Sequence, residues 1–321
     1  MRIMITGGAG FIGSHLCEKY TNEGHMVLCM DNFMSGNLLN VKHLLNCRNF
    51  KLVKGDIRDF NQLKETARDV DVIFHLAAQI HVDRSYIEPR LTYDVNVMGT
   101  QNILEIARLH DAKKVIYAST SEVYGSAQYA PIDEKHPLNA PHPYGASKIA
   151  ADRMCHAYIQ TYGMDISIPR LFNAFGPRQR DIGYGGVISI FTRRVLSNTP
   201  PIIYGDGLQT RDYTYVEDVV RAFDLVLNYN KPVNEPVNFG NGSEVSILDL
   251  ANLIINLCGK KGVIKPVHVE PRIGEVQRLI ADATKAKNLL GWEPKWDLEK
   301  GLSQFVRWYK DYGFEERVKI D

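Results

Sequence analysis

A tyrosine and a lysine four residues apart are the residues best suited to chemistry in this 321-residue chain. They lie in the stretch Tyr144-Gly145-Ala146-Ser147-Lys148, where apolar residues recur at helical spacing, so both are predicted to share one helix face. An ammonium beside a phenol favours the phenolate and lowers a pKa that is normally about 10. A phenolate can accept a proton from an alcohol while hydride leaves the carbon. This spacing also occurs by chance in many helices, so the interpretation needs support from the rest of the chain.

A second polar group follows a predicted strand at 114–118. Thr120, Ser121 and Glu122 stand at the carboxyl end of that strand, where ligands bind in open α/β sheets. A polar turn would explain the threonine and the serine, but it does not require a long acid before valine. Glu122 is therefore a candidate general acid or base.

A glycine-rich turn near the start of the chain predicts a dinucleotide site. Gly7, Gly10 and Gly13 follow a predicted strand at 2–6 and precede a helical run at 14–22. Without Cβ atoms, pyrophosphate can approach the backbone N–H groups at the helix N-terminus. The next strand, 26–30, ends in Asp31, whose carboxylate suits a ribose diol and would repel a 2′-phosphate. NAD is therefore favoured over NADP.

Further cofactor contacts are predicted along the same half of the chain. Asp56 follows a strand at 50–53 and could bind the adenine amine or, equally, cap a helix. Small alanines after a strand at 70–74 leave room for a cofactor above the sheet. The complete predicted NAD-binding set is Gly7, Gly10, Phe11, Ile12, Gly13, Asp31, Asn32, Asp56, Ile57, Leu76, Ala77, Ala78, Asn96, Tyr144 and Lys148.

Strands alternating with helices predict an α/β protein, a Rossmann-like doubly wound parallel sheet with a smaller C-terminal substrate-binding lobe. The NAD-binding domain is predicted at 1–168 and the interleaved lobe at 169–321, with a strand near 236–240 that returns to the main sheet. The helix at 283–290 is expected to be the last substantial one.

Composition and charge argue against several other classes of protein. The formal net charge of +1 gives no basis for binding nucleic acid or an anionic membrane. There is no apolar run of about 18 residues, and the first residues do not resemble a signal peptide. Five scattered cysteines suit reduced thiols and do not form a zinc motif. We therefore expect a cytoplasmic protein with no metal site.

Taken in order, these motifs resemble an extended short-chain dehydrogenase/reductase acting on nucleotide-diphosphate sugars. GGAGFIG, HLAAQ, YxxxK, FNAFGP and GDGLQTRDYTYVED together cover nearly the whole chain. The resemblance implies that Tyr144 removes the 4-hydroxyl proton, Lys148 lowers its pKa and binds the nicotinamide ribose, and Thr120 binds O4. It also implies a homodimer. The substrate contacts predicted with it are His81, Asp83, Asn173, Val187, Arg211, Asn238 and Arg278.

Glu122 favours one branch of that family. Simple 4-epimerases typically lack an acid there, whereas 4,6-dehydratases need a base for the C5 proton once C4 is a ketone. The resemblance therefore predicts an NAD-dependent 4,6-dehydratase: C4 is oxidised, Glu122 takes the C5 proton, water leaves from C6 and hydride returns. The product would be a 4-keto-6-deoxy sugar or a 5,6-ene variant.

Two alternatives stay open at this point. A UDP-sugar 4-epimerase is the first, and a decarboxylase of nucleotide-sugar acids is the second. Decarboxylases share Thr-Ser-Glu but usually carry a basic stretch, which the residues near Arg278 do not supply. Ser121 stands where glucose-type dehydratases carry an aspartate that protonates the C6 hydroxyl, so the sequence does not identify that acid. The nucleotide base and the hexose are not readable from these residues.

Overall fold

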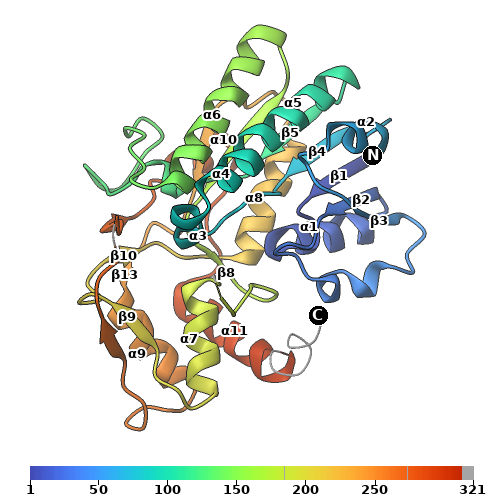
Figure 1. Cartoon of the computed structure of the whole chain (residues 1–321). Coiled ribbons are helices and arrows are strands. Elements are labelled where there is room, and N and C mark those ends of the chain that lie inside the picture. Colours follow the sequence, from blue (N-terminus) through green and yellow to red (C-terminus); the bar gives the residue numbers. More distant parts are fainter. Residues whose placement is uncertain (184, 273, 313–321) are drawn as a thin grey trace.

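The computed structural model describes residues 1–183, 185–272 and 274–312, so the last residues of the predicted lobe, 313–321, lie outside the described range. A large parallel sheet with helices on both faces stands above a smaller lobe that contains α7 (Val187–Leu196), α9 (Ile247–Leu257) and α11 (Leu298–Tyr312) (Figure 1). The predicted Rossmann-like architecture is confirmed.

The main sheet has the strand order β12-β7-β5-β4-β1-β2-β3, with β6 paired beside β7. Every pairing within it is parallel. The order reverses between β1 and β4, and such a reversal opens a crevice at the carboxyl ends of the strands. The strands are β1 (Arg2–Thr6), β2 (Met26–Asp31), β3 (Phe50–Lys54), β4 (Val72–His75), β5 (Lys114–Tyr117), β6 (Ser119–Thr120), β7 (Ile166–Leu171) and β12 (Pro236–Phe239).

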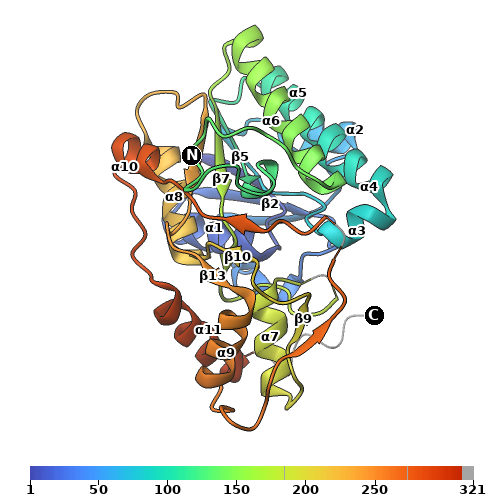
Figure 2. The ribbon, with the colours of Figure 1, turned by 90° about the vertical axis from the view of Figure 1, so that its left-hand side faces the viewer.

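Helices cover both faces because the buried strands are apolar on both sides. Ile3 and Ile5 of β1 pack with α1, α8 and α10, whereas Met4 packs with α2, α5 and α6. Figure 2 shows α5 and α6 on one side of the sheet and α8 on the other. The helices around the sheet are α1 (Phe11–Asn22), α2 (Phe60–Thr66), α3 (Val82–Ile87), α4 (Pro89–Tyr93), the π-helical η3 (Asp94–Met98), α5 (Gly99–Leu109), α6 (Pro143–Tyr162), α8 (Val216–Asn228) and α10 (Thr284–Leu290).

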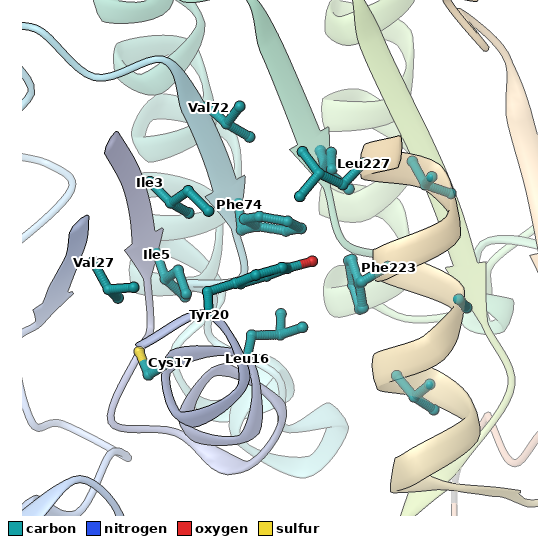
Figure 3. Close-up of a cluster of buried hydrophobic side chains, with 14 of the residues drawn as sticks. Ile3, Ile5, Leu16, Cys17, Tyr20, Val27, Val72, Phe74, Phe223 and Leu227 are labelled. Atoms are coloured by element: carbon teal, nitrogen blue, oxygen red, sulfur yellow. The ribbon is translucent and has the colours of Figure 1, made fainter. Parts of the chain in front are cut away.

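An aromatic cluster joins the two halves of the chain. Tyr20 of α1 stacks on Phe74 of β4 with ring centroids 5.2 Å apart, and Phe223 of α8 meets Phe74 edge-on at 6.1 Å (Figure 3). Burying a side chain of this size contributes about 1.5–3 kcal/mol. Because α8 belongs to the second half of the sequence, the two predicted parts share one core.

The lobe packs α7, α9 and α11 around small sheets and short strands. The prediction that 283–290 holds the last substantial helix is wrong, since α11 follows it. Leu302, Phe305, Val306 and Tyr309 recur at helical spacing and are buried in the lobe's core. The short strands pair as β8 (Ala174–Phe175) with β11 (Thr214–Tyr215), β9 (Ile202–Tyr204) with β14 (Val267–Val269), and β10 (Thr210–Arg211) with both β13 (Val245–Ser246) and β15 (Arg278–Leu279).

The two predicted parts are interleaved at several points. Strand β7 runs through residue 168, and α8, β12 and α10 of the second half all pack in or on the main sheet. The main sheet is therefore built from both halves of the sequence. Among the helices that the structure describes, none has both the length and the apolar character needed to cross a bilayer.

A buried ion pair fastens α6 to the sheet. Arg170 of β7 donates from Nε and Nη2 to Oδ2 of Asp152 on α6, at 2.9 and 2.8 Å. The two residues are 1% and 0% exposed, and Ser119 also donates to Asp152, at 2.6 Å. Because neither charge reaches water, each depends on the other for compensation.

We expect Asp152→Ala to lower the free energy of unfolding by about 3–5 kcal/mol, because the Arg170 charge would stay buried without its partner. Urea unfolding followed by circular dichroism measures this loss. The double variant Asp152→Ala/Arg170→Met should be more stable than Asp152→Ala alone, since it removes the uncompensated charge. Equal stability of the two variants would contradict this explanation.

Candidate active site

The predicted dinucleotide turn lies at the carboxyl end of β1, beside the point where the strand order reverses. Gly10 precedes α1 and has no side chain to cap it, which leaves the first backbone N–H groups of the helix for an anion. Gly7 has a φ of +69°, and a Cβ on Gly13 would lie 2.2 Å from the Gly7 oxygen. The turn therefore has no room for side chains at these positions, and its backbone can approach a pyrophosphate closely.

We expect Gly13→Ala to weaken NAD binding about tenfold or more, because the new methyl group must displace the Gly7 backbone and overpacking costs about 1–3 kcal/mol. Titration of NAD followed by protein fluorescence measures the change. Gly259→Ala is the matched control, since a Cβ there meets nothing within 4 Å. It should cost some stability at its positive φ and leave NAD affinity unchanged. Equal NAD affinity in the Gly13 variant and the unsubstituted protein would contradict the tight-turn argument.

Asp31 lies at the end of β2 and connects this turn to the next loop. Its carboxylate accepts hydrogen bonds from the backbone N–H of Ala9 at 3.0 Å and of Phe33 at 2.8 Å. Burial raises the pKa of Asp31, and the two backbone hydrogen bonds act in the opposite direction. The residue therefore fixes the loop next to the glycine turn, at the position where a ribose diol was predicted.

Asp56, which was predicted to bind the adenine amine, lies in a small polar cluster. Asn32 donates to Asp56 at 2.9 Å, and Arg58 holds the other side of the same carboxylate. The Arg58 hydrogen bond is the main reason why the pKa of Asp56 falls to about 2. The alternative that Asp56 caps a helix is wrong, because Asp59 is the residue that caps α2. Ile57 is buried against Gly99.

The segment after β4 passes directly over the glycine turn. A Cβ on Gly7 would lie 2.9 Å from the backbone nitrogen of Ala77 and 3.0 Å from the carbonyl carbon of Leu76. Leu76, Ala77 and Ala78 are all partly exposed, as a surface that faces a cofactor must be.

Asn96 has hydrogen-bond partners within the protein. Its amide is 2% exposed, accepts from the Gln79 N–H at 2.8 Å, and donates to the backbone oxygen of Gln79 and to Ser147, each at 2.9 Å. Its contact with the cofactor stays a prediction. Asn96 ties the segment after β4 to α6.

Tyr144 and Lys148 both lie at the buried start of α6. Pro143 opens the helix, and His142 caps it by accepting from the Gly145 N–H at 3.0 Å. The Lys148 ammonium donates to the Ala118 oxygen at 2.7 Å. Burial lowers the pKa of Lys148 to about 8. The predicted sharing of one helix face is therefore accompanied by a specific anchor for the lysine at the end of β5.

The pKa of Tyr144 differs from the expectation based on spacing. Burial raises it, a hydrogen bond with Thr120 lowers it, and the Glu122 carboxylate raises it, with a net increase. The lowering that spacing assigned to Lys148 is not among these effects, because the ammonium group is directed at the Ala118 oxygen. Thr120, in contrast, forms a hydrogen bond with the Tyr144 side chain, and this bond favours the phenolate.

Glu122 lies on the short 3₁₀ helix η4 (Ser121–Val123), which Thr120 caps by accepting from the Glu122 N–H at 3.2 Å. Its carboxylate is 3.1 Å from Nε2 of His142. Burial raises the pKa of Glu122, but the His142 hydrogen bond and the charge of Arg211 outweigh it, and the net pKa is below its ordinary value. Glu122 is thus a partly exposed carboxylate that is ionised at neutral pH. Ser121 is buried beside it.

His142 is a residue of this site that the sequence argument missed. Its ring stacks on Tyr144 at a centroid distance of 6.0 Å and an interplanar angle of 13°, and it hydrogen-bonds Glu122. The available signal was the polar residue directly before Pro143, since such a residue commonly caps a helix. The sequence offered no indication that this cap would also contact Glu122.

Charged side chains from the lobe face this group. Arg211 of β10 acts on the pKa of Glu122 and pairs with Glu275 at 2.7 Å. Arg278 is half exposed and pairs with Glu244. Arg211 and Arg278, the two arginines among the predicted substrate contacts, therefore lie on neighbouring strands, β10 and β15, and each is paired with a carboxylate.

The segment before β15 also lies against α3. Arg272 pairs with Asp83 at 3.2 Å and stands 4.1 Å from the ring centroid of Tyr204. A Cβ on Gly274 would lie 2.7 Å from the Tyr86 hydroxyl. Arg272 and Tyr86 were not among the predicted residues, since only the folded chain brings these segments together.

Four further predicted substrate contacts lie on different elements of the structure. His81 precedes α3, where burial lowers its pKa to about 4, and Val187 begins α7. Asn173 donates to the backbone carbonyl oxygen of Asp212 at 3.0 Å. Asn238 is 0% exposed, accepts from the Tyr124 hydroxyl and donates to the backbone oxygen of Ile132, and its substrate contact stays a prediction.

Comparisons with known proteins identify the family of this chain. The family model described as GDP-mannose 4,6 dehydratase matches residues 4–305. A putative UDP-glucose 4-epimerase of Methanocaldococcus jannaschii is 42% identical, with 96% of this chain and 98% of the relative covered. UDP-glucuronic acid decarboxylase 1 of Xenopus tropicalis is 38% identical, with 96% and 72% covered.

Solved structures give the same picture. DesIV, a dTDP-glucose 4,6-dehydratase of Streptomyces venezuelae solved with NAD bound, superposes with a TM-score of 0.93 at 33% identity, covering 99% of this chain and all of that one. Its NAD supports the cofactor predicted from the glycine turn and Asp31. The three relatives carry out different reactions, so the choice among them depends on the catalytic side chains.

Proposed function

The chain belongs to the extended short-chain dehydrogenase/reductase family of nucleotide-sugar epimerases, dehydratases and decarboxylases that use NAD, and we propose that it is a 4,6-dehydratase of a nucleotide-diphosphate hexose. One observation carries this proposal. Glu122 is an ionised carboxylate with an 18% exposed side chain, and it is hydrogen-bonded to His142, whose ring stacks on Tyr144. Transfer of a hydride and a hydroxyl proton alone would not require this second base.

The first step belongs to Tyr144 and its neighbours. Tyr144 accepts the proton of the sugar 4-hydroxyl, and Thr120 contacts both that oxygen and the Tyr144 hydroxyl. Bound NAD supplies the acceptor for the C4 hydride. The Lys148 ammonium is anchored on the backbone oxygen of Ala118, and we infer that it binds the nicotinamide ribose.

The second step belongs to Glu122. A ketone at C4 makes the C5 hydrogen acidic, and the Glu122 carboxylate takes that proton. The C6–O bond then breaks, and the proton held by Glu122 can pass to the departing hydroxyl, so that water leaves without a separate acid. Return of the C4 hydride to C6 and addition of a solvent proton at C5 would then give the 4-keto-6-deoxy sugar and leave the cofactor oxidised again. This balance suits a site in which serine stands at position 121.

A 4-epimerase is the second candidate, because the Methanocaldococcus jannaschii relative bears that name. Tyr144, Thr120 and Lys148 would serve it equally, and Glu122 would then only bind the sugar. Arg211 is shared by both candidates as a contact to the diphosphate, since its planar guanidinium can hold phosphate oxygens in pairs.

Mass spectrometry of products formed in deuterated water tests the proposal. The panel is UDP-, dTDP-, GDP- and CDP-hexoses, with a UDP-hexuronate added to detect loss of carbon dioxide. A product lighter by one water with deuterium at C5 is expected, and the same loss without deuterium indicates the 5,6-ene variant. A product of unchanged mass with altered chromatographic mobility identifies an epimerase and contradicts the proposal.

A further inference from the structure

We propose that His142 is a positioning residue that orients the Glu122 carboxylate and keeps it ionised, while the same ring caps the helix that carries Tyr144. The effect on Glu122 is a property of the protein itself. Its consequence for the reaction, a Glu122 base available at neutral pH, rests on the proposed function.

Hydrogen bonds on both ring nitrogens fix the tautomer of His142. Nδ1 accepts the Gly145 N–H at 3.0 Å, so it carries no proton. The ring proton is therefore on Nε2, which donates to Oε2 of Glu122 at 3.1 Å. A donor on one carboxylate oxygen favours the ionised form and holds its orientation. The helix cap thus determines which nitrogen serves the carboxylate.

Packing prevents the ring from turning away. The His142 side chain is 1% exposed, against 18% for Glu122, so the carboxylate retains access to the site while the ring does not. Tyr144 stacks on one face and Tyr86 meets the ring edge-on at 6.4 Å. Gly145 makes this approach of the ring to α6 possible, because a Cβ there would lie 3.1 Å from Cε1 of His142 and 2.8 Å from the backbone carbonyl oxygen of Glu122.

Other charged or titratable groups also face Glu122 and set the size of the effect. Arg211 approaches from β10 and favours the carboxylate, although Glu275 pairs with it. Tyr144 on α6 and Tyr86 on α3 both have their pKa values raised in part by the Glu122 charge. Without the His142 donor, only the partly neutralised Arg211 would oppose the effect of burial. The Glu122 carboxylate would then take up a proton at a higher pH.

The test uses His142→Ser, because serine is a preferred helix cap and can still accept from the Gly145 N–H without reaching Glu122. His142→Asn, a second cap-retaining variant, guards against a folding defect in the first. Carbon-13 NMR of protein labelled at the glutamate carboxyl carbon follows Glu122 directly, with its signal assigned by its loss in Glu122→Gln. We expect Glu122 to titrate at higher pH in both variants, and an unchanged titration in either folded variant would overturn the inference.

A kinetic measurement links the inference to the reaction. In His142→Ser we expect C5 hydrogen exchange to fall about 10- to 100-fold, in line with loss of a hydrogen bond to a charged group, and its acidic limb to move to higher pH. In the Glu122→Gln background, adding His142→Ser should produce no further fall. A further fall would show that His142 acts on the reaction by another route and would overturn its positioning role.

Failure of this inference and failure of the proposed function give different results. If the products show epimerisation, the proposed function fails, while the NMR titration still decides whether His142 controls Glu122. If elimination occurs and the titration is unchanged, the function stands and the inference is overturned.

Discussion

Replacing Tyr144 by phenylalanine is expected to reduce turnover by about 10²–10⁴-fold, the usual contribution of a positioned acid or base. The variant loses the hydroxyl that hydrogen-bonds Thr120 and keeps the ring that stacks on His142. The start of α6 should therefore remain intact, and only proton transfer from the 4-hydroxyl should suffer. Steady-state kinetics on the hexose identified by the product panel measure the loss.

Tyr158→Phe is the matched control for this variant. Tyr158 lies on the same helix, and its hydroxyl donates to Glu105 at 2.6 Å, away from the Tyr144 group. It should lose no more than a small amount of stability and retain full turnover. NAD titration of both variants should give unchanged affinity. Turnover of Tyr144→Phe within a few-fold of the unsubstituted protein would exclude Tyr144 as the base.

The local motifs of the sequence were sufficient to predict the sheet and the glycine turn. A strand, glycines at positions 7, 10 and 13, and an acid after the next strand are all set by short-range geometry. The parallel order follows because strands alternate with helices. The helix α11 was missed since its charged outer face obscures an apolar stripe at Leu302, Phe305 and Val306.

Residues that depend on distant partners were harder to predict. Asn96 and Asn238 were predicted to bind ligands, and the structure shows that both amides also have hydrogen-bond partners within the protein. A polar residue near a strand end suits either role, and its sequence neighbours do not indicate such partners. His142 was missed for a related reason. Its sequence neighbours indicate a helix start, but they do not indicate its contact with Glu122, which lies about 20 residues earlier in the chain.

The electrostatics of the site depend on contacts that spacing cannot supply. Tyr144 and Lys148 lie at the predicted i, i+4 positions, but the ammonium group is bound to the Ala118 oxygen. Burial then dominates and raises the pKa of Tyr144. Partial burial acts in the same direction on Glu122, but His142 and Arg211 outweigh it, and the pKa of Glu122 falls. The surroundings of Tyr144 therefore favour its neutral form, whereas those of Glu122 favour the carboxylate.

Replacing Glu122 by glutamine is expected to lower C5 hydrogen exchange by about 10²–10⁴-fold while oxidation at C4 survives. Glutamine has nearly the same size, and its amide oxygen can still accept from Nε2 of His142, so the cap on α6 should persist. What the variant lacks is a group that can take a proton at neutral pH. Exchange in deuterated water reports the C5 step, and the absorbance of reduced NAD reports the C4 step.

The ratio of these two rates distinguishes the candidate reactions. In a dehydratase, the Glu122 variant should accumulate the oxidised sugar, because C4 chemistry proceeds and elimination does not. Glu105→Gln is the control, since that carboxylate is bound to Arg108 and Tyr158 on the outer helices and should leave both rates unchanged. Retained C5 exchange in Glu122→Gln would exclude Glu122 as the base. If the unsubstituted protein shows no C5 exchange at all, the conserved mass of an epimerised product becomes the expected result, and Glu122 is then a sugar-binding acid.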